Sequence, residues 1–142
     1  MAVDERQIWK NGNTPPLLLA LTGGGFRGYF TALVLARLEE LLNAPCCKVF
    51  DLIAGTSIGG IIALALSNGV RAQQIAAKIR EKGLAIFPDL WFSGTRRFIG
   101  PPYNTSGIAD ALRELLAAQA GNALNKSQQR VMVATVYCPP PL

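Results

Sequence analysis

Short apolar runs alternate with helical patterns along most of the chain. Three runs are continuous enough for strands that are buried on both faces, over residues 17–22, 49–54 and 131–137. Apolar residues recur at helical spacing between them, which predicts helices over residues 30–42, 58–67, 72–87 and 105–121. Strands separated by helices in this order pair in parallel and carry helices on both faces of the sheet. The pattern therefore predicts an α/β fold with three α/β/α layers around a mainly parallel sheet.

The helix predicted after the first strand has a continuous apolar face. Its members are three or four positions apart, or adjacent: Phe30, Leu33, Val34, Leu38, Leu41 and Leu42. Asn43-Ala44-Pro45 ends this helix, and Asn68-Gly69 ends the helix over 58–67. In the helix over 72–87 we expect Ile75 and Ile79 to face the core.

Three stretches lack a regular pattern and set the domain boundaries. Residues 1–16 form a polar lead-in that ends in two prolines. Residues 88–104 combine prolines and glycines with four aromatic residues and two adjacent arginines, which fits either a lipid-facing lid or a loop pinned to the body. The run of prolines at 139–141 is typical of a loop between elements of a fold that continues beyond it. We therefore expect residues 17–142 to be the N-terminal part of a larger domain, incomplete at its C-terminus.

Composition indicates a globular protein without a secretory framework. Hydrophobic residues make up 50% of the 142 residues and charged residues 16%. The net charge of +5 is spread along the chain, so it permits weak attraction to anionic lipid but indicates no nucleic-acid polymer. Three cysteines form no disulfide framework, and the sequence shows neither a signal peptide nor a transmembrane run. A reducing, cytoplasmic location is the resulting expectation.

The chain contains no histidine. A Ser-His-Asp triad cannot be built from it, so any nucleophilic serine needs a different base. A metal site with histidine ligands is excluded as well, and three poorly spaced cysteines do not replace one. We therefore expect no metal and no cofactor.

The motif Gly55-Thr56-Ser57-Ile58-Gly59 lies between a predicted strand and a predicted helix. A serine at the apex of a sharp strand-to-helix turn is the arrangement of a nucleophile elbow, in which the flanking glycines make room for a strained backbone. Ser57 also precedes a helix N-terminus, where free N–H groups favour developing negative charge. Ser57 is thus the candidate nucleophile, and the alternative is a simple Gly/Ser turn between two core elements.

A second glycine motif follows the first strand. Gly23, Gly25 and Gly28 satisfy G-x-G-x-x-G ahead of a helix, which is the context of a dinucleotide-binding loop. Such a loop needs an acidic residue where the second strand ends to hold the ribose hydroxyls. The second strand leads into Gly55-Thr56-Ser57 instead, and Asp51 is near its start. Nucleotide binding is therefore kept as the weaker alternative.

The favoured interpretation joins the two motifs. The carboxyl ends of neighbouring parallel strands meet at one edge of a sheet, so the glycine loop is expected to face Ser57. Backbone N–H groups of a glycine loop can approach a carbonyl oxygen closely and form an oxyanion hole. The candidate oxyanion residues are Gly23, Gly24, Gly25, Arg27 and Gly28. Arg27 adds a charge that suits a substrate phosphate, although it also fits an ordinary surface position.

These two motifs carry a family resemblance. Gly23-Gly24-Gly25-Phe26-Arg27-Gly28, followed by Asp51-Leu52-Ile53-Ala54-Gly55-Thr56-Ser57-Ile58-Gly59-Gly60, resembles a patatin-like phospholipase domain over most of the chain. The resemblance implies a three-layer α/β/α fold, a Ser–Asp dyad with Ser57 as nucleophile, and an oxyanion loop around Gly24 and Gly25. The implied substrates are acyl esters of glycerophospholipids.

More narrowly, the chain resembles bacterial patatin-like effectors of antiphage systems. That resemblance implies hydrolysis of membrane lipid at the membrane surface and activation by a cyclic dinucleotide. An unpaired sheet edge would also favour an oligomer.

One feature departs from the family pattern. The family's base is an aspartate in a downstream Asp-Gly-Gly or Asp-Gly-Ala motif, and no Asp-Gly occurs here. The four aspartates are Asp4, Asp51, Asp89 and Asp110. Asp51 is one strand length from Ser57 and is expected to be structural. Two hypotheses follow: an acyl hydrolase whose base lies beyond residue 142, or a non-catalytic module that keeps the fold.

Overall fold

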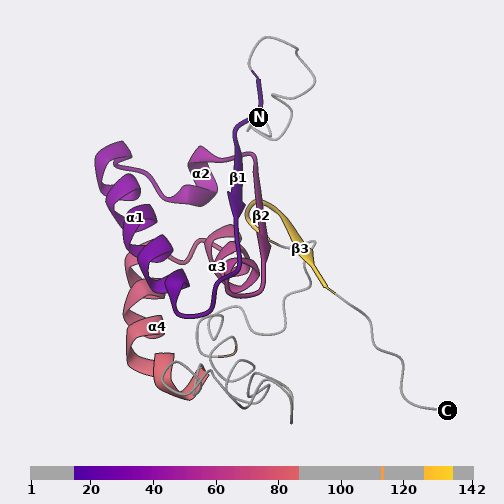
Figure 1. The fold of residues 1–142 in the computed structure, drawn as a ribbon. Helices are drawn as coiled ribbons and strands as arrows, with labels where there is room; N and C mark the ends of the chain where they lie inside the picture. The colour runs from indigo at the N-terminus through magenta and orange to yellow at the C-terminus, as the bar shows by residue number, and fades with distance from the viewer. Residues whose placement is uncertain (1–14, 87–112, 114–126, 136–142) are drawn as a thin grey trace, which may run out of the picture.

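The computed structural model describes residues 15–86, 113 and 127–135, which build a parallel sheet with helices packed on it (Figure 1). The strands are β1 (Leu18–Leu21), β2 (Leu52–Thr56) and β3 (Arg130–Ala134), in the order β1-β2-β3. Both pairings are parallel, and in register Leu19 is opposite Ile53, which is opposite Val131. The predicted α/β class and the parallel pairing are confirmed.

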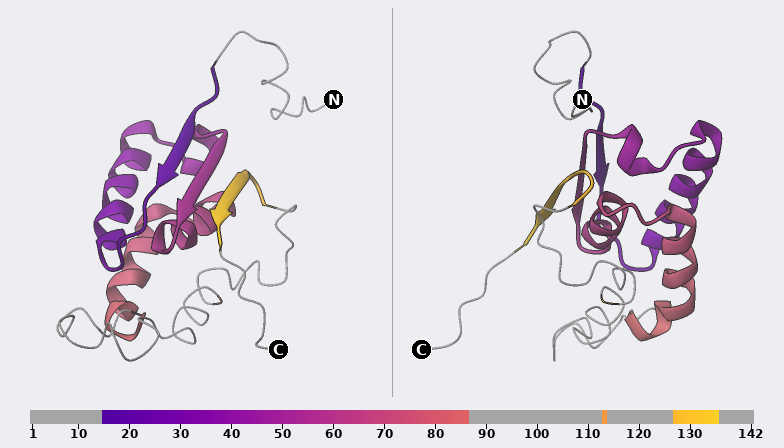
Figure 2. Two further views of the ribbon diagram at one scale, coloured as in Figure 1. Left: turned by 45° about the vertical axis from the view of Figure 1, so that its right-hand side comes forward. Right: turned by 180° about the vertical axis from the view of Figure 1, so that it is seen from behind.

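The helices of the described residues lie on one side of this sheet (Figure 2). They are α1 (Arg27–Leu42), α2 (Cys46–Val49), α3 (Ile58–Ser67) and α4 (Ala72–Ile86). Helix α3 packs against all three strands, and α1 packs chiefly against α4. The predicted helix over 105–121 and the loop over 88–104 lie outside the described residues, apart from residue 113. Within the described ranges, no helix has the length and apolarity needed to cross a bilayer.

The core lies between the sheet and the helices on that side. Ile53 of β2 is fully buried in one cluster with Ile62 and Leu66 of α3, and Ile75 and Ile79 of α4 face the core as predicted. The opposite face of the sheet is open in the described part of the chain, where Leu18 is 59% exposed and Met132 60%. Because successive side chains of a strand point to opposite faces of the sheet, one face is packed against the helices and the other is open in the described residues.

Helix α1 forms as predicted, but the face assigned to it from its large apolar residues is not the buried one. Phe30 is 69% exposed, and Leu33, Val34, Leu41 and Leu42 are exposed as well. The buried positions are Gly28, Ala32, Leu35, Ala36 and Glu39. Leu38 is the one member of the predicted face that packs against the core. Small residues let α1 approach its neighbours closely, and the other large side chains of the predicted face are exposed.

The predicted second strand begins too early. Residues Cys46–Val49 form the short helix α2, and β2 starts at Leu52. Pro45 precedes α2 in an extended conformation, and the Phe50 N–H donates to the carbonyl oxygen of Cys46 at 3.0 Å. The apolar character of this stretch is that of a buried turn, which a short apolar run does not distinguish from a strand.

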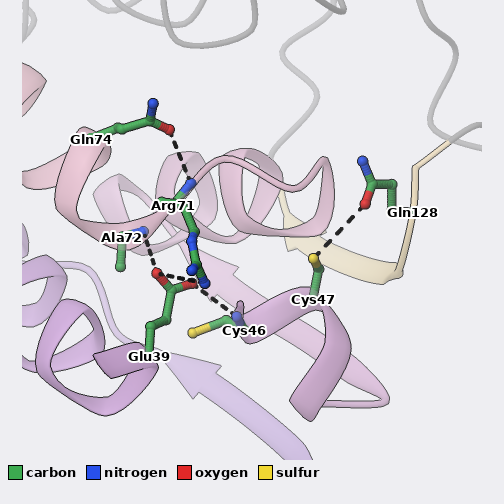
Figure 3. Close-up of polar contacts among 7 residues, drawn as sticks. All are labelled: Glu39, Cys46, Cys47, Arg71, Ala72, Gln74 and Gln128. Carbon is green, nitrogen blue, oxygen red and sulfur yellow. Dashed lines mark hydrogen bonds and ion pairs between the residues drawn. The ribbon is translucent and has the colours of Figure 1, made fainter. Parts of the chain in front are cut away.

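A buried carboxylate ties three helices together (Figure 3). Glu39 of α1 is 6% exposed, and its Oε1 accepts a hydrogen bond from the Cys46 N–H at 2.9 Å. Its Oε2 accepts one from the Ala72 N–H at 3.0 Å and lies 4.0 Å from the Arg71 guanidinium. Glu39 thereby satisfies the first N–H group of α2 and of α4, which neither helix can bond internally.

Candidate active site

Ser57 occupies the turn between β2 and α3 in a rare backbone conformation. Its φ is 53° and its ψ is −129°. Asn43 is the other non-glycine residue with positive φ in the described ranges, and it adopts the ordinary left-handed conformation after α1. Conformations as unusual as that of Ser57 cost about 1–3 kcal/mol and persist where the surroundings enforce them. Ser57 is exposed, so the strand, strained turn and helix of a nucleophile elbow are all present.

Glycines let α3 start directly against the sheet. A side chain at Gly55 would overlap the carbonyl group of Gly59, and a Cβ at Gly59 would lie 2.5 Å from the Leu21 oxygen. Gly60 plays a similar part, because a Cβ there would lie 2.9 Å from Val133 Cγ1. The motif marks Gly55 and Gly59 in the sequence, whereas the need for Gly60 depends on its contact with β3.

The glycine loop lies against the elbow. A Cβ at Gly23 would be 2.9 Å from Ser57 Cβ, and one at Gly28 would be 2.5 Å from Ile58 Cγ1. The Gly23 N–H donates a hydrogen bond to Thr56 Oγ1 at 3.0 Å. The two motifs, far apart in sequence, therefore meet at the carboxyl ends of β1 and β2, where the sequence predicted their meeting.

The backbone N–H groups of the glycine loop fall into two sets. Those of Gly23, Arg27 and Gly28 already donate, to Thr56 Oγ1 and to the carbonyl oxygens of Gly24 and Gly25. Those of Gly24 and Gly25 have no partner among the described residues. At the elbow the same holds for the N–H groups of Ile58 and Gly59, which begin α3. Unpaired donors from both motifs thus gather around Ser57.

Arg27 lies within the Gly23–Gly28 loop and is the first residue of α1. Its side chain folds back along the loop, since a Cβ at Gly24 would lie 3.1 Å from its Nε. The residue is exposed, and the described residues offer its guanidinium no hydrogen bond or ion pair. A cation at a helix N-terminus is unfavourable for the helix dipole, so helix stability does not account for its presence.

Asp51 stands at the opposite end of β2 from Ser57. Its Oδ2 accepts a hydrogen bond from the Leu17 N–H at 2.8 Å, and its own N–H donates to the Leu17 carbonyl oxygen at 2.8 Å. At about 3.3 Å per residue, the intervening strand separates Asp51 and Ser57 by roughly 20 Å. Asp51 fastens β1 to β2 and cannot serve as the base for Ser57. Asp4, Asp89 and Asp110 lie outside the described residues.

Neither described cysteine competes with Ser57 as a nucleophile. Burial is the main cause and the nearby Glu39 carboxylate the next, and together they raise the pKa of the Cys46 thiol to about 12. Burial also raises the pKa of Cys47. Both thiols stay protonated at neutral pH, and a protonated thiol is a poor nucleophile. In the part of the chain that the structure covers, no group of three or more acidic or cysteine side chains is arranged to hold a metal ion.

Comparison with known proteins gives the same family as the two motifs. A "cGAMP-activated phospholipase" of Pseudomonas aeruginosa is 38% identical over 123 residues, which are 84% of this chain and 35% of that protein. A "cUMP-AMP-activated phospholipase" of Escherichia coli is 45% identical over 64 residues, covering 45% of this chain and 20% of that protein. "Patatin-like protein 2" of Oryza sativa is 31% identical over 137 residues, covering 83% and 33%. The Pseudomonas aeruginosa and Oryza sativa relatives match most of this chain, and the chain covers about a third of the length of each.

The family profile described as patatin-like phospholipase matches residues 19–136, which include all of β1 except Leu18, the glycine loop, the elbow and β3. Because this match extends over most of the chain, the protein belongs to the patatin-like phospholipase family.

Proposed function

We propose that the protein is a serine acyl hydrolase that cleaves ester bonds of membrane lipids, with Ser57 as the nucleophile. The observation that carries the proposal is the strained backbone of Ser57 at an exposed strand-to-helix turn, with a glycine loop packed directly against it. Folding alone gives no reason to keep a serine at φ 53°. Two relatives are named cGAMP-activated phospholipase and cUMP-AMP-activated phospholipase, and these names support the same reaction class.

In the proposed reaction, Ser57 Oγ attacks the ester carbonyl carbon while a base takes its proton. The N–H groups of Gly24 and Gly25 bind the oxyanion that forms, and Ile58 adds a donor from the first turn of α3. The tetrahedral intermediate collapses, the alcohol leaves with the proton, and Ser57 carries the acyl group. Water, deprotonated by the same base, then attacks the acyl-enzyme carbonyl carbon; the base returns this proton to Ser57 Oγ as the bond to the acyl group breaks and the fatty acid is released.

The base in this proposal is an aspartate located beyond residue 142, since Asp51 is engaged at the far end of β2. Arg27 is proposed to attract the phosphate of the lipid head group, because its guanidinium is exposed beside the loop. Action at the membrane surface, activation by a cyclic dinucleotide and a role in antiphage defence belong to the proposal for the whole protein. They rest on relatives of which this chain covers about a third.

The test is hydrolysis of a soluble acyl ester by the full-length protein and by its Ser57→Ala variant. We expect wild-type turnover and complete loss in the variant, together with loss of labelling by a serine-reactive fluorophosphonate. Ser67→Ala is the matched control, because Ser67 is buried at the far end of the helix that Ser57 precedes, and its hydroxyl donates to the Leu64 carbonyl oxygen at 2.9 Å. Turnover that survives Ser57→Ala would rule out the proposal.

A non-catalytic lipid-binding module is the second candidate function. The position of Asp51 favours it, because the described residues place no carboxylate beside Ser57. The two candidates differ in one measurement, which is the hydrolysis of the soluble ester by full-length wild-type protein. Absence of turnover, combined with binding to phospholipid vesicles, would favour the module.

A further inference from the structure

The glycine loop is attached to the elbow at both of its ends. At the first end, the Gly23 N–H donates to Thr56 Oγ1 at 3.0 Å, a hydrogen bond between residues 33 positions apart. The fit is close around this bond, because a Cβ at Gly23 would lie 3.2 Å from the Thr56 carbonyl oxygen. Thr56 is the last residue of β2, immediately before Ser57.

At the second end, Gly28 packs against Ile58, the residue immediately after Ser57. A Cβ at Gly28 would lie 2.5 Å from Ile58 Cγ1, and Ile58 is 2% exposed. The two neighbours of Ser57 in the chain therefore hold the two ends of the loop, one by a hydrogen bond and one by packing. These two contacts set the position of the loop relative to Ser57.

Between these ends the loop forms a tight turn of its own. The Arg27 N–H donates to the Gly24 oxygen at 3.2 Å, and the Gly28 N–H donates to the Gly25 oxygen at 3.0 Å. Gly25 has a φ of 58°. These bonds fix the shape of the turn but not its position relative to Ser57, which depends on the attachments at Gly23 and Gly28.

We propose that Thr56 is a positioning residue, whose hydroxyl group holds Gly23 so that the free N–H groups of Gly24 and Gly25 stay directed toward the oxygen of the carbonyl group whose carbon Ser57 attacks. The inference rests on the proposed acyl-hydrolase function. Threonine suits this role better than serine because its branched Cβ restricts χ1 and keeps the hydroxyl oriented. A displacement of about 1 Å at a reacting centre can lower the rate about a hundredfold.

The first experiment tests the hydrogen bond itself by amide hydrogen exchange at Gly23, resolved by NMR. Thr56→Val removes the acceptor with little change of shape, and Thr56→Ser keeps it. We expect exchange at Gly23 to be about tenfold faster in Thr56→Val and near the wild-type rate in Thr56→Ser. Thr31→Val is the matched control, because the Thr31 hydroxyl, one turn into α1, donates to the Arg27 carbonyl oxygen within the same helix. Unchanged exchange at Gly23 in Thr56→Val would overturn the inference.

The second experiment tests positioning by steady-state hydrolysis of a soluble acyl ester by the full-length protein. We expect kcat to fall about ten- to a hundredfold in Thr56→Val while KM stays within about twofold, because the lost interaction acts on the transition state. Thr56→Ser should restore kcat to within about threefold of wild type, and Thr31→Val should match wild type. The thermal midpoints of Thr56→Val and Thr56→Ser should agree, which separates positioning from a folding defect.

The outcomes separate this inference from the function on which it rests. If wild type hydrolyses the ester and Ser57→Ala does not, while Thr56→Val retains the wild-type kcat, the function stands and the role of Thr56 is overturned. If Thr56→Val raises KM and leaves kcat unchanged, Thr56 acts in substrate binding and the inference again fails. If wild type shows no hydrolysis, the proposed function and this inference fail together.

Discussion

Two regions of the molecule treat helix N-termini in opposite ways. At Glu39, one buried carboxylate accepts the first N–H groups of α2 and α4. At Ser57, the N-termini of α1 and α3 meet, and neither Phe26 nor Ser57 provides a side-chain cap. Both regions start from the same chemistry, since every helix begins with N–H groups that lack internal partners.

The difference between the two regions shows where helix N–H groups are left without a partner from the protein. Buried donors without partners are strongly destabilising, so the interior region is closed by an anion from the protein's own chain. The Gly24 and Gly25 donors beside the exposed Ser57 belong to partly exposed residues, so water can satisfy them, and in the proposed reaction a substrate oxygen replaces the water. The closed region should therefore govern stability and the open region activity, a division that substitutions can test.

The largest effect on stability is expected for Glu39→Gln. An amide keeps one acceptor oxygen but turns its NH₂ group toward a helix N–H, leaving a buried donor unpaired. We expect a loss of about 2–3 kcal/mol in the free energy of unfolding, measured by urea denaturation. Glu40→Gln is the control, because Glu40 forms an exposed pair with Arg37 and should cost under about 0.5 kcal/mol. Equal losses in the two variants would contradict the comparison.

The next largest effect is expected for Gly28→Ala. Helix α1 carries Glu39 and Gly28, and this substitution tests how closely α1 packs against the elbow. The added methyl group would meet Ile58 Cγ1 at 2.5 Å, so we expect a loss of about 1–3 kcal/mol in the free energy of unfolding. Ile58→Ala provides the space for that methyl group. The double variant should be more stable than the sum of the single effects by at least about 1 kcal/mol, and simple additivity would mean that the contact is not strained.

Ser57→Gly is expected to stabilise the protein while abolishing activity. Glycine adopts positive φ without steric strain, so relief of about 1–3 kcal/mol should outweigh its extra unfolded-state entropy of about 0.5–1 kcal/mol. Ser57→Ala keeps the Cβ and should show no such gain. Thermal melting of the two variants beside wild type gives the answer, and equal melting temperatures in both variants would remove the evidence for strain at the elbow.

The smallest expected effect concerns Cys46 at high pH. Its pKa rises from 9.0 to about 12 on folding, so between these values the unfolded chain releases a proton that the folded chain retains. Stability that is present below pH 9 is therefore lost as pH rises toward 12. From pH 8 to pH 10 we expect wild type to lose about 1 kcal/mol more than Cys46→Ala in the free energy of unfolding. Parallel pH profiles would refute this.

Much of the site was predictable because its requirements are local. The spacing of Gly55, Ser57 and Gly59 alone indicates a sharp turn. The parallel arrangement of β1 and β2 then brings the Gly23–Gly28 loop to the same edge of the sheet as Ser57. The role of Gly60 and the bond from Gly23 to Thr56 were not predictable, because each depends on which residue of another strand or loop lies opposite. The Cys46–Val49 helix was missed because a stretch of four residues is too short for its apolar positions to distinguish a helical turn from the approach to a strand.

The sequence by itself determined the parallel α/β arrangement, the sharp strand-to-helix turn at Ser57 and the adjacent glycine loop, since hydrophobic period and glycine placement are local properties of the chain. Only the tertiary structure decided which face of α1 is buried, because close approach to α4 favours Ala32 and Ala36 over the larger Phe30 and Val34. It also decided that Glu39 is a structural anion and that Asp51 fastens two strands. Those roles depend on which N–H groups lie within about 3 Å of each carboxylate, and packing alone sets that distance.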